Sequence, residues 1–179
     1  MGLPVQDNIA PTMGKGNHMN TREHQGRRAL LGGAATLLLA AHLPAWAKGI
    51  KVEVWKDPDC GCCKDWVAHL QASGFDVKVN DGGNDAVRKQ LGIDPKYGSC
   101  HTAKVGGYAI EGHVPAREIH RLLKERPKAL GLSVPGMPVG TPGMDAPVYG
   151  GRKDPFKVLL LARDGGASVY QAYEGKTKA

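Results

Sequence analysis

The feature that most constrains the fold is a cluster of three cysteines placed where a strand gives way to a helix. Residues 50–55 alternate apolar and charged side chains, which is typical of a half-buried strand. The segment from about Cys62 to Ser73 then carries apolar residues at helical spacing. Cys60, Cys62 and Cys63 therefore lie at the start of a helix that directly follows a strand. A C-x-x-C pair in this position favours a thioredoxin-like domain.

The rest of the chain continues this alternation of strands and helices. Further strands are expected at 75–79, 103–105, 108–111, 157–162 and 167–173, and helices at 84–91 and 115–126. The order predicts a thioredoxin-like α/β domain with a mixed sheet and flanking helices. A right-handed crossover would make its first two strands parallel. The Gly/Pro-rich residues 128–151 are predicted to form a loop, and residues 157–173 a C-terminal β-hairpin added to the sheet.

Residues 1–47 are predicted to be an export signal. Arg27 and Arg28 precede an apolar run at 29–41, and the small-x-small site at 45–47 closes the segment. The apolar run is shorter than the ~20 residues that span a bilayer. The arginine pair fits a twin-arginine signal, and an ordinary secretory signal fits as well. We therefore expect cleavage after residue 47 and an exported mature domain at 48–179, with no membrane attachment after cleavage.

The charge of the chain argues against nucleic acid as a partner. The chain has 24 Lys and Arg against 17 Asp and Glu, a formal net charge of +7. These basic residues are dispersed among acidic ones, as in the stretch 152–154, and they form no stripe alternating with aromatic residues. We therefore expect no nucleic-acid partner.

All four cysteines of the chain belong to one predicted site. Cys60 and Cys63 form a C-x-x-C pair, and Cys62 adds a third thiol in the same turn. A helix N-terminus lowers the pKa of nearby thiols and favours the thiolate, which binds soft metals. Cys100 precedes the third predicted strand, where thioredoxin-like domains bring a loop, usually with a cis-proline, over the cysteine motif. Here residues 99–102 contain no proline, and several thiolates on a short arc make a soft-metal site.

Two methionines extend the soft donor set. Met137 and Met144 are the methionines that remain after leader removal, and each ends a Pro-Gly-Met sequence in the 128–151 loop. Thioethers on such a loop serve as exposed contacts, as loop anchors or as soft-metal ligands. Thiolate together with thioether selects Cu(I) over zinc, because zinc sites use Cys, His and carboxylate ligands.

The histidines of the mature chain are expected to play unequal roles. His101 adjoins Cys100 and is predicted to ligate the metal or tune the site. His113 is expected to orient the helix that follows it, and His69 and His120 are expected on helix surfaces. The predicted metal-site residues are Cys60, Cys62, Cys63, Cys100, Met137, Met144 and His101.

In combination these motifs resemble the DUF411 family, which consists of exported, thioredoxin-like copper-resistance proteins of the CopG type. The resemblance rests on the stretches 60–66, 100–103, 107–116 and 134–144, and it covers roughly residues 50–148. It implies periplasmic copper handling, with a cysteine-bridged Cu(I) cluster, the loop methionines as extra ligands and copper redox exchange. The implied partners are copper ions and other periplasmic copper-handling proteins.

Four functions remain open on the residues alone. The leading one is a copper-binding protein that holds Cu(I) and cycles the copper redox state in copper tolerance. An exported thiol–disulfide oxidoreductase would use Cys60 as nucleophile and Cys63 as resolving thiol, but it would not need the third thiol or the methionine loop. A structural zinc site would use the four cysteines as ligands and neither methionine. The last alternative is a pair of structural disulfides, Cys60–Cys63 and Cys62–Cys100.

Overall fold

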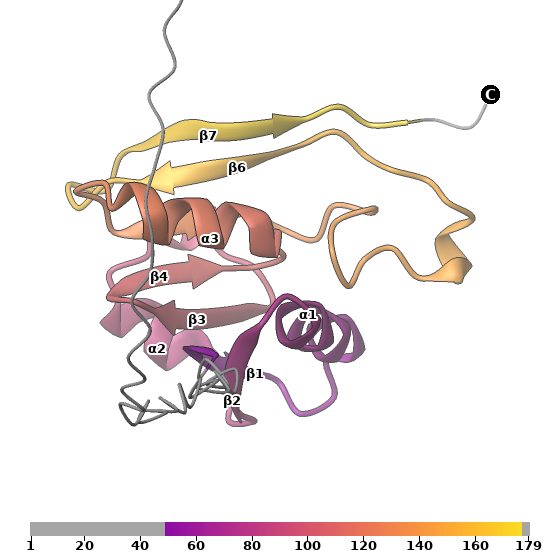
Figure 1. The fold of residues 1–179 in the computed structure, drawn as a ribbon, viewed down its shortest axis with the longest axis horizontal. Coiled ribbons are helices and arrows are strands. Elements are labelled where there is room, and N and C mark those ends of the chain that lie inside the picture. Colours follow the sequence, from indigo (N-terminus) through magenta and orange to yellow (C-terminus); the bar gives the residue numbers. More distant parts are fainter. Residues whose placement is uncertain (1–48, 177–179) are drawn as a thin grey trace, which may run out of the picture. The chain divides into compact units, whose positions relative to one another are not determined.

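A mixed sheet of seven strands runs through residues 49–176, the part of the chain that this computed structural model describes (Figure 1). The strands are β1 (Ile50–Lys56), β2 (Phe75–Asn80), β3 (His101–Val105), β4 (Tyr108–Glu111), β5 (Gly131–Ser133), β6 (Phe156–Leu161) and β7 (Ala167–Tyr173). The helices are α1 (Gly61–Ala72), α2 (Asp85–Gln90) and α3 (Ala116–Glu125), with short 3-10 turns η1 (Pro95–Tyr97) and η2 (Pro147–Tyr149). The predicted export signal, residues 1–47, lies outside the described residues. No helix within residues 49–176 has the length and apolarity that crossing a membrane requires.

The predicted α/β class is confirmed. The sheet order is β2-β1-β3-β4-β5-β6-β7, with β1 parallel to β2 and antiparallel to β3. The parallel pairing follows from the α1 crossover, as the sequence predicted. The C-terminal hairpin is also found, and it extends the sheet at the end opposite to β2 (Figure 1).

Helices α1 and α3 bury their apolar stripes against one face of the sheet. Both contribute to a single core cluster, which includes Val52, Val54, Trp66, Leu70, Ile110, Ile119 and Leu122. A smaller cluster around Ile93, Ala109 and Leu161 lies on the other face, because successive side chains of a strand point to opposite faces. Helix α1, whose N-terminal end carries three of the cysteines, is therefore anchored in the core.

The prediction that residues 128–151 form only a loop is wrong in one place. Residues 131–133 form β5, which pairs parallel with β4 and antiparallel with β6 and so joins the hairpin to the rest of the sheet. A Cβ at Gly131 would lie 1.7 Å from the Ala109 carbonyl oxygen, so this strand needs glycine at its closest approach to β4. Three residues that include a glycine show no hydrophobic period, which is why the sequence did not indicate this strand.

Strand β3 begins two residues earlier than predicted. His101 and Thr102 pair with Lys56 and Trp55 at the end of β1. Cys100 therefore directly precedes the first residue of β3, a central strand, beside the end of β1. The length of this strand was underestimated because His101 and Thr102 follow a turn-rich stretch and show no alternation of apolar and polar residues.

The hairpin is also tied to α3 by polar contacts. The Tyr170 hydroxyl donates to Glu125 at 2.7 Å, and the Tyr173 hydroxyl donates to Glu118 at 2.8 Å. The Arg121 guanidinium lies over the Tyr170 ring, 4.0 Å from its centroid. The added hairpin is therefore an integral part of the described structure.

Candidate metal centre

The four cysteine sulfurs meet at the N-terminus of α1. Cys60 is the N-cap residue, while Cys62 and Cys63 lie in the first turn. The Cys100 sulfur lies 3.4 Å from that of Cys63 and 3.9 Å from that of Cys62. All four sulfurs fall within 4.8 Å of one another. The two distant segments of the chain thus converge, as the strand order of the sheet requires.

Two of the cysteines are oxidised and two are free. Cys60 and Cys63 form a disulfide, whereas Cys62 and Cys100 are half-buried thiols. The Cys62 sulfur is 3.5 Å from that of Cys60, so each free thiol lies beside one sulfur of the disulfide. Of the two structural disulfides considered from the sequence, Cys60–Cys63 is therefore present and Cys62–Cys100 is not formed.

Cys100 has an unusual environment for a thiol. Burial raises its pKa to about 12, and the neighbouring Cys62 contributes in the same direction because two thiolates would repel each other. In the metal-free protein Cys100 is therefore a neutral thiol. A cation that binds here must displace its proton, so metal affinity rises with pH.

His101 lies beneath this thiol in the core. Its ring is fully buried, packs at a tilt against Trp66 with 4.2 Å between ring centroids, and has Nδ1 3.4 Å from the Cys100 sulfur. Its Nε2 atom has no hydrogen-bond partner within residues 49–176. Burial, together with the nearby His113, holds the pKa of His101 well below its usual range, so the imidazole is neutral. A neutral imidazole is the form that binds a metal.

His113 belongs to the same group, which the sequence analysis missed. Its Nε2 lies 3.1 Å from the Cys100 sulfur, and its Nδ1–H donates to the Pro142 carbonyl at 2.8 Å. Cys100, His101 and His113 together form a second set of closely spaced donors. The β3–β4 register pairs Thr102 with Glu111, and continuing this register beyond the strands places His113 opposite Cys100. The register of the β3–β4 hairpin is therefore the signal that could have identified His113.

The other two histidines join helices rather than lying freely on their surfaces. His69 is half-buried, and its Nε2 accepts a hydrogen bond from the Ala116 N–H at the start of α3, at 3.1 Å. His120 of α3 stacks on Phe75 with ring centroids 4.4 Å apart, and its Nε2 lies 3.0 Å from the carbonyl oxygen of Ser73 at the end of α1. Both hold α1 and its neighbours together and stand outside the cysteine cluster.

Each Pro-Gly-Met turn packs against a segment that carries a cysteine. The Gly136 N–H donates to the Gly98 carbonyl at 3.0 Å, next to Ser99 and Cys100. Gly143 lies so close to α1 that a Cβ there would be 2.5 Å from the Cys62 carbonyl oxygen. The two turns thus flank the cluster on both cysteine-bearing segments.

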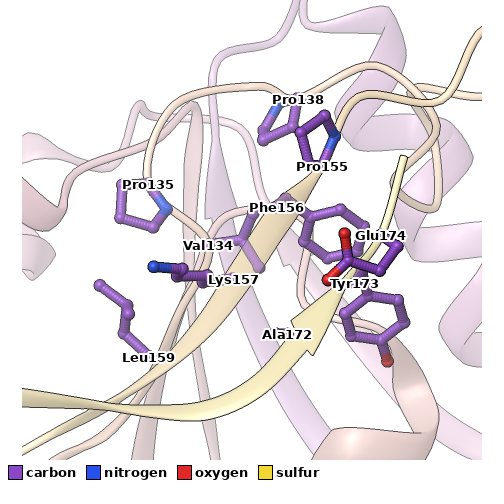
Figure 2. Close-up of a pocket in the computed structure, with 10 residues that line it drawn as sticks. All are labelled: Val134, Pro135, Pro138, Pro155, Phe156, Lys157, Leu159, Ala172, Tyr173 and Glu174. Atoms are coloured by element: carbon purple, nitrogen blue, oxygen red, sulfur yellow. The ribbon is translucent and has the colours of Figure 1, made fainter. Parts of the chain in front are cut away.

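The two methionine side chains differ in exposure. Met144 is buried, with its sulfur 3.7 Å from the Tyr149 hydroxyl, whereas Met137 is 52% exposed. Their loop also borders a pocket of about 560 Å³ (Figure 2). The pocket is lined mainly by apolar side chains of the loop and the hairpin, among them Val134, Pro135, Pro138, Phe156 and Leu159. None of the predicted ligands lines it, so it is distinct from the cysteine cluster.

Comparison with known proteins supports the expected family. The family model described as "Protein of unknown function, DUF411" matches residues 97–144, which include Cys100, His101, His113 and both methionines. No curated protein matches the chain. Two solved structures titled copper resistance protein CopG are 45% identical to the chain. The match to form 1 covers 71% of this chain and 99% of the CopG chain, with a TM-score of 0.66. The match to form 2 covers 70% of this chain and 98% of the CopG chain, with a TM-score of 0.64. The chain therefore belongs to the DUF411 family, and the copper resistance protein CopG is among its relatives.

Proposed function

We propose that the mature chain is an exported, periplasmic protein that holds Cu(I) in a cysteine, histidine and methionine site and serves copper tolerance. The observation that carries the proposal is the convergence of four cysteine sulfurs within 4.8 Å at the start of α1. The relatives titled copper resistance protein CopG support the choice of copper. Thiolate and thioether donors favour Cu(I) over the harder cations.

The donor set fits a metal ion. A buried polar atom normally has a hydrogen-bond partner, and His101 Nε2 has none within the described residues. His113 is oriented by the bond from its Nδ1–H to the Pro142 carbonyl, which leaves Nε2 as the metal-binding atom. The residues proposed to hold copper are Cys60, Cys62, Cys63, Cys100, His101, His113, Met137 and Met144.

The oxidation state of the cysteines would control how much copper the site holds. Reduction of the Cys60–Cys63 disulfide consumes two electrons and two protons and releases two further thiols. Four thiols then become available, next to imidazoles that also suit the oxidised metal. We therefore propose that the protein exchanges electrons with copper: when the thiols of Cys60 and Cys63 are oxidised to the disulfide, two protons leave and the two electrons released reduce two Cu(II) ions to Cu(I). We also propose that other periplasmic copper-handling proteins deliver or receive the metal.

Copper counting after reduction tests the proposal. The protein is reduced without oxygen, loaded with Cu(I), freed of excess metal by a competing chelator and examined by elemental analysis. We expect retained copper, and we expect its loss in the double variant Cys62→Ser/Cys100→Ser. The same copper content in that variant would contradict the proposal. Zinc in place of copper in the natively purified protein would favour the structural zinc site instead.

A thiol–disulfide oxidoreductase is the second candidate, and the Cys60–Cys63 disulfide is the observation that favours it. This activity would not need copper. An insulin-reduction assay on the metal-free protein separates the two functions, because efficient turnover that depends on Cys60 and Cys63 would favour the oxidoreductase. We expect little turnover, because Cys62 and Cys100 lie beside the disulfide and compete for it.

A further inference from the structure

The residue before Cys100 is held at each of its polar groups. The Ser99 N–H donates to Glu111 Oε1 at 2.7 Å. Its carbonyl accepts from Asn84 Nδ2 at 3.3 Å and also from the Arg88 guanidinium. Its hydroxyl donates to the Gly136 carbonyl at 2.5 Å. The peptide that leads into Cys100 is therefore fixed far more firmly than an ordinary loop residue.

A buried ion pair is at the centre of this arrangement. Glu111 is fully buried, and its Oε1 lies 2.8 Å from Arg88 Nε. The other carboxylate oxygen accepts a hydrogen bond from the Thr102 hydroxyl at 2.5 Å. Removing two charges from water is costly, and a buried pair can cost more than its attraction returns. The pair does, however, bind residues on both sides of Cys100 and His101, namely Ser99 and Thr102.

The ion pair and His101 lie on opposite faces of the sheet. His101, Ala103 and Val105 of β3 point to the face covered by α1, where His101 meets Trp66. Side chains alternate along a strand, so Thr102 points to the other face, where α2 supplies Arg88. Among the described residues, neither Glu111 nor Arg88 forms a hydrogen bond with a cysteine sulfur. They act on the donors through the backbone.

We propose that Glu111 and Arg88 are positioning residues that hold Cys100 against the cysteines of α1. Because the Ser99 hydroxyl also binds the Gly136 carbonyl, the same pair sets the turn that carries Met137. The inference rests on the copper site proposed above. Groups that support metal ligands in this way typically change metal affinity by about 10- to 100-fold when they are replaced.

The test uses Glu111→Gln with Glu118→Gln as a matched control. Glu118 is also a buried carboxylate with an arginine partner, but it binds Tyr173 and attaches the hairpin to α3. We expect Glu111→Gln to weaken Cu(I) binding by about 10- to 100-fold in a chelator competition. Glu118→Gln should leave copper affinity unchanged while lowering stability. Equal copper affinities in the two variants would overturn the proposal.

A second readout requires no copper. In the reduced, metal-free protein, the rate of alkylation of Cys100 relative to Cys62 is followed by peptide mass spectrometry. We expect this ratio to change severalfold in Glu111→Gln and not in Glu118→Gln, because only the first variant releases the Ser99 peptide. If the wild type retains no copper but the ratio still changes, the copper function fails and the positioning role stands. An unchanged ratio would overturn the positioning role.

A conservative variant separates charge from geometry. Arg88→Lys keeps the positive charge, but an ammonium group cannot reproduce the planar fork that binds both Glu111 and the Ser99 carbonyl. We expect copper affinity and the alkylation ratio between those of the wild type and Glu111→Gln. Full recovery to wild-type values would show that charge alone matters and would contradict the positioning of Ser99 by Arg88.

Discussion

The cysteines and the methionines of this protein are held in different ways. The cysteines lie at the start of a core helix and directly before a central strand, where their sulfurs fall within 4.8 Å. The methionines lie on Gly/Pro turns, and Met137 is 52% exposed while Met144 is buried. The comparison teaches that the sheet and helix fix the thiol donors, whereas the loop carries one buried and one exposed thioether. The predictions below test this division.

The largest effect is expected for the cysteine that joins the two segments. Cys100 lies within 3.9 Å of the sulfurs of Cys62 and Cys63 and 3.1 Å from His113 Nε2. Cys100→Ser should weaken Cu(I) binding by more than about 100-fold, because loss of a ligand exceeds the loss of a supporting group. Chelator competition measures this effect. If Cys100→Ser lowered Cu(I) affinity no more than Met137→Leu does, the proposed difference between the cysteines and the methionines would be contradicted.

The two turn glycines offer a matched pair for stability. Both have positive φ, but a Cβ at Gly143 would meet the Cys62 carbonyl oxygen at 2.5 Å, whereas nothing lies within 4 Å of one at Gly136. Gly136→Ala should cost about 1–2 kcal/mol from backbone strain alone. Gly143→Ala should cost about 1–3 kcal/mol more, because the turn must move away from α1. Urea unfolding of the metal-free protein tests this, and equal costs would contradict the close packing of the second turn.

The methionines themselves should show a smaller, graded effect. Leucine has a similar volume, so Met144→Leu and Met137→Leu should each cost less than about 1.5 kcal/mol in stability. Met144→Leu should weaken Cu(I) binding by about tenfold, and Met137→Leu by less, because the exposed thioether must be ordered before it binds. Chelator competition on both variants ranks them. The reverse ranking would contradict the link between burial and contribution.

The smallest effect concerns pH. Burial lowers the pKa values of His69, His101 and His113 below 6.5, with His113 adding to the effect on His101. The unfolded chain therefore binds more protons than the folded one as the pH falls below this value. The free energy of unfolding of the metal-free protein should decrease from pH 7 to pH 5. Urea titrations at several pH values measure the slope, and His69→Gln should make it shallower. An equally steep slope in that variant would exclude His69 as a contributor.

Much of the cysteine site followed from local patterns. The alternation at 50–55 and the helical spacing after Cys60 placed three cysteines at a strand–helix junction, and the expected topology brought Cys100 to them. Each of these steps depends on nearest neighbours in the chain or on a general rule of handedness. Strand β5 was not predicted, because its three residues are too few to show a hydrophobic period.

The rest of the site depends on contacts that a local pattern does not contain. His113 reaches Cys100 through the strand register, and Arg88 and Glu111 pair across 23 positions of the chain. Both charged residues belong to types that are almost never buried without a partner, so their burial could not be inferred from the residues themselves. The relation between the Met turns and the cysteines likewise arises from backbone packing at Gly136 and Gly143.

X-ray absorption at the copper edge of the reduced, Cu(I)-loaded protein tests the central claim most directly, because it identifies the atoms bound to the metal. The convergence of the four cysteine sulfurs within 4.8 Å predicts a first shell dominated by sulfur, with fewer sulfur neighbours in Cys100→Ser. A first shell of nitrogen and oxygen alone, unchanged in that variant, would contradict it.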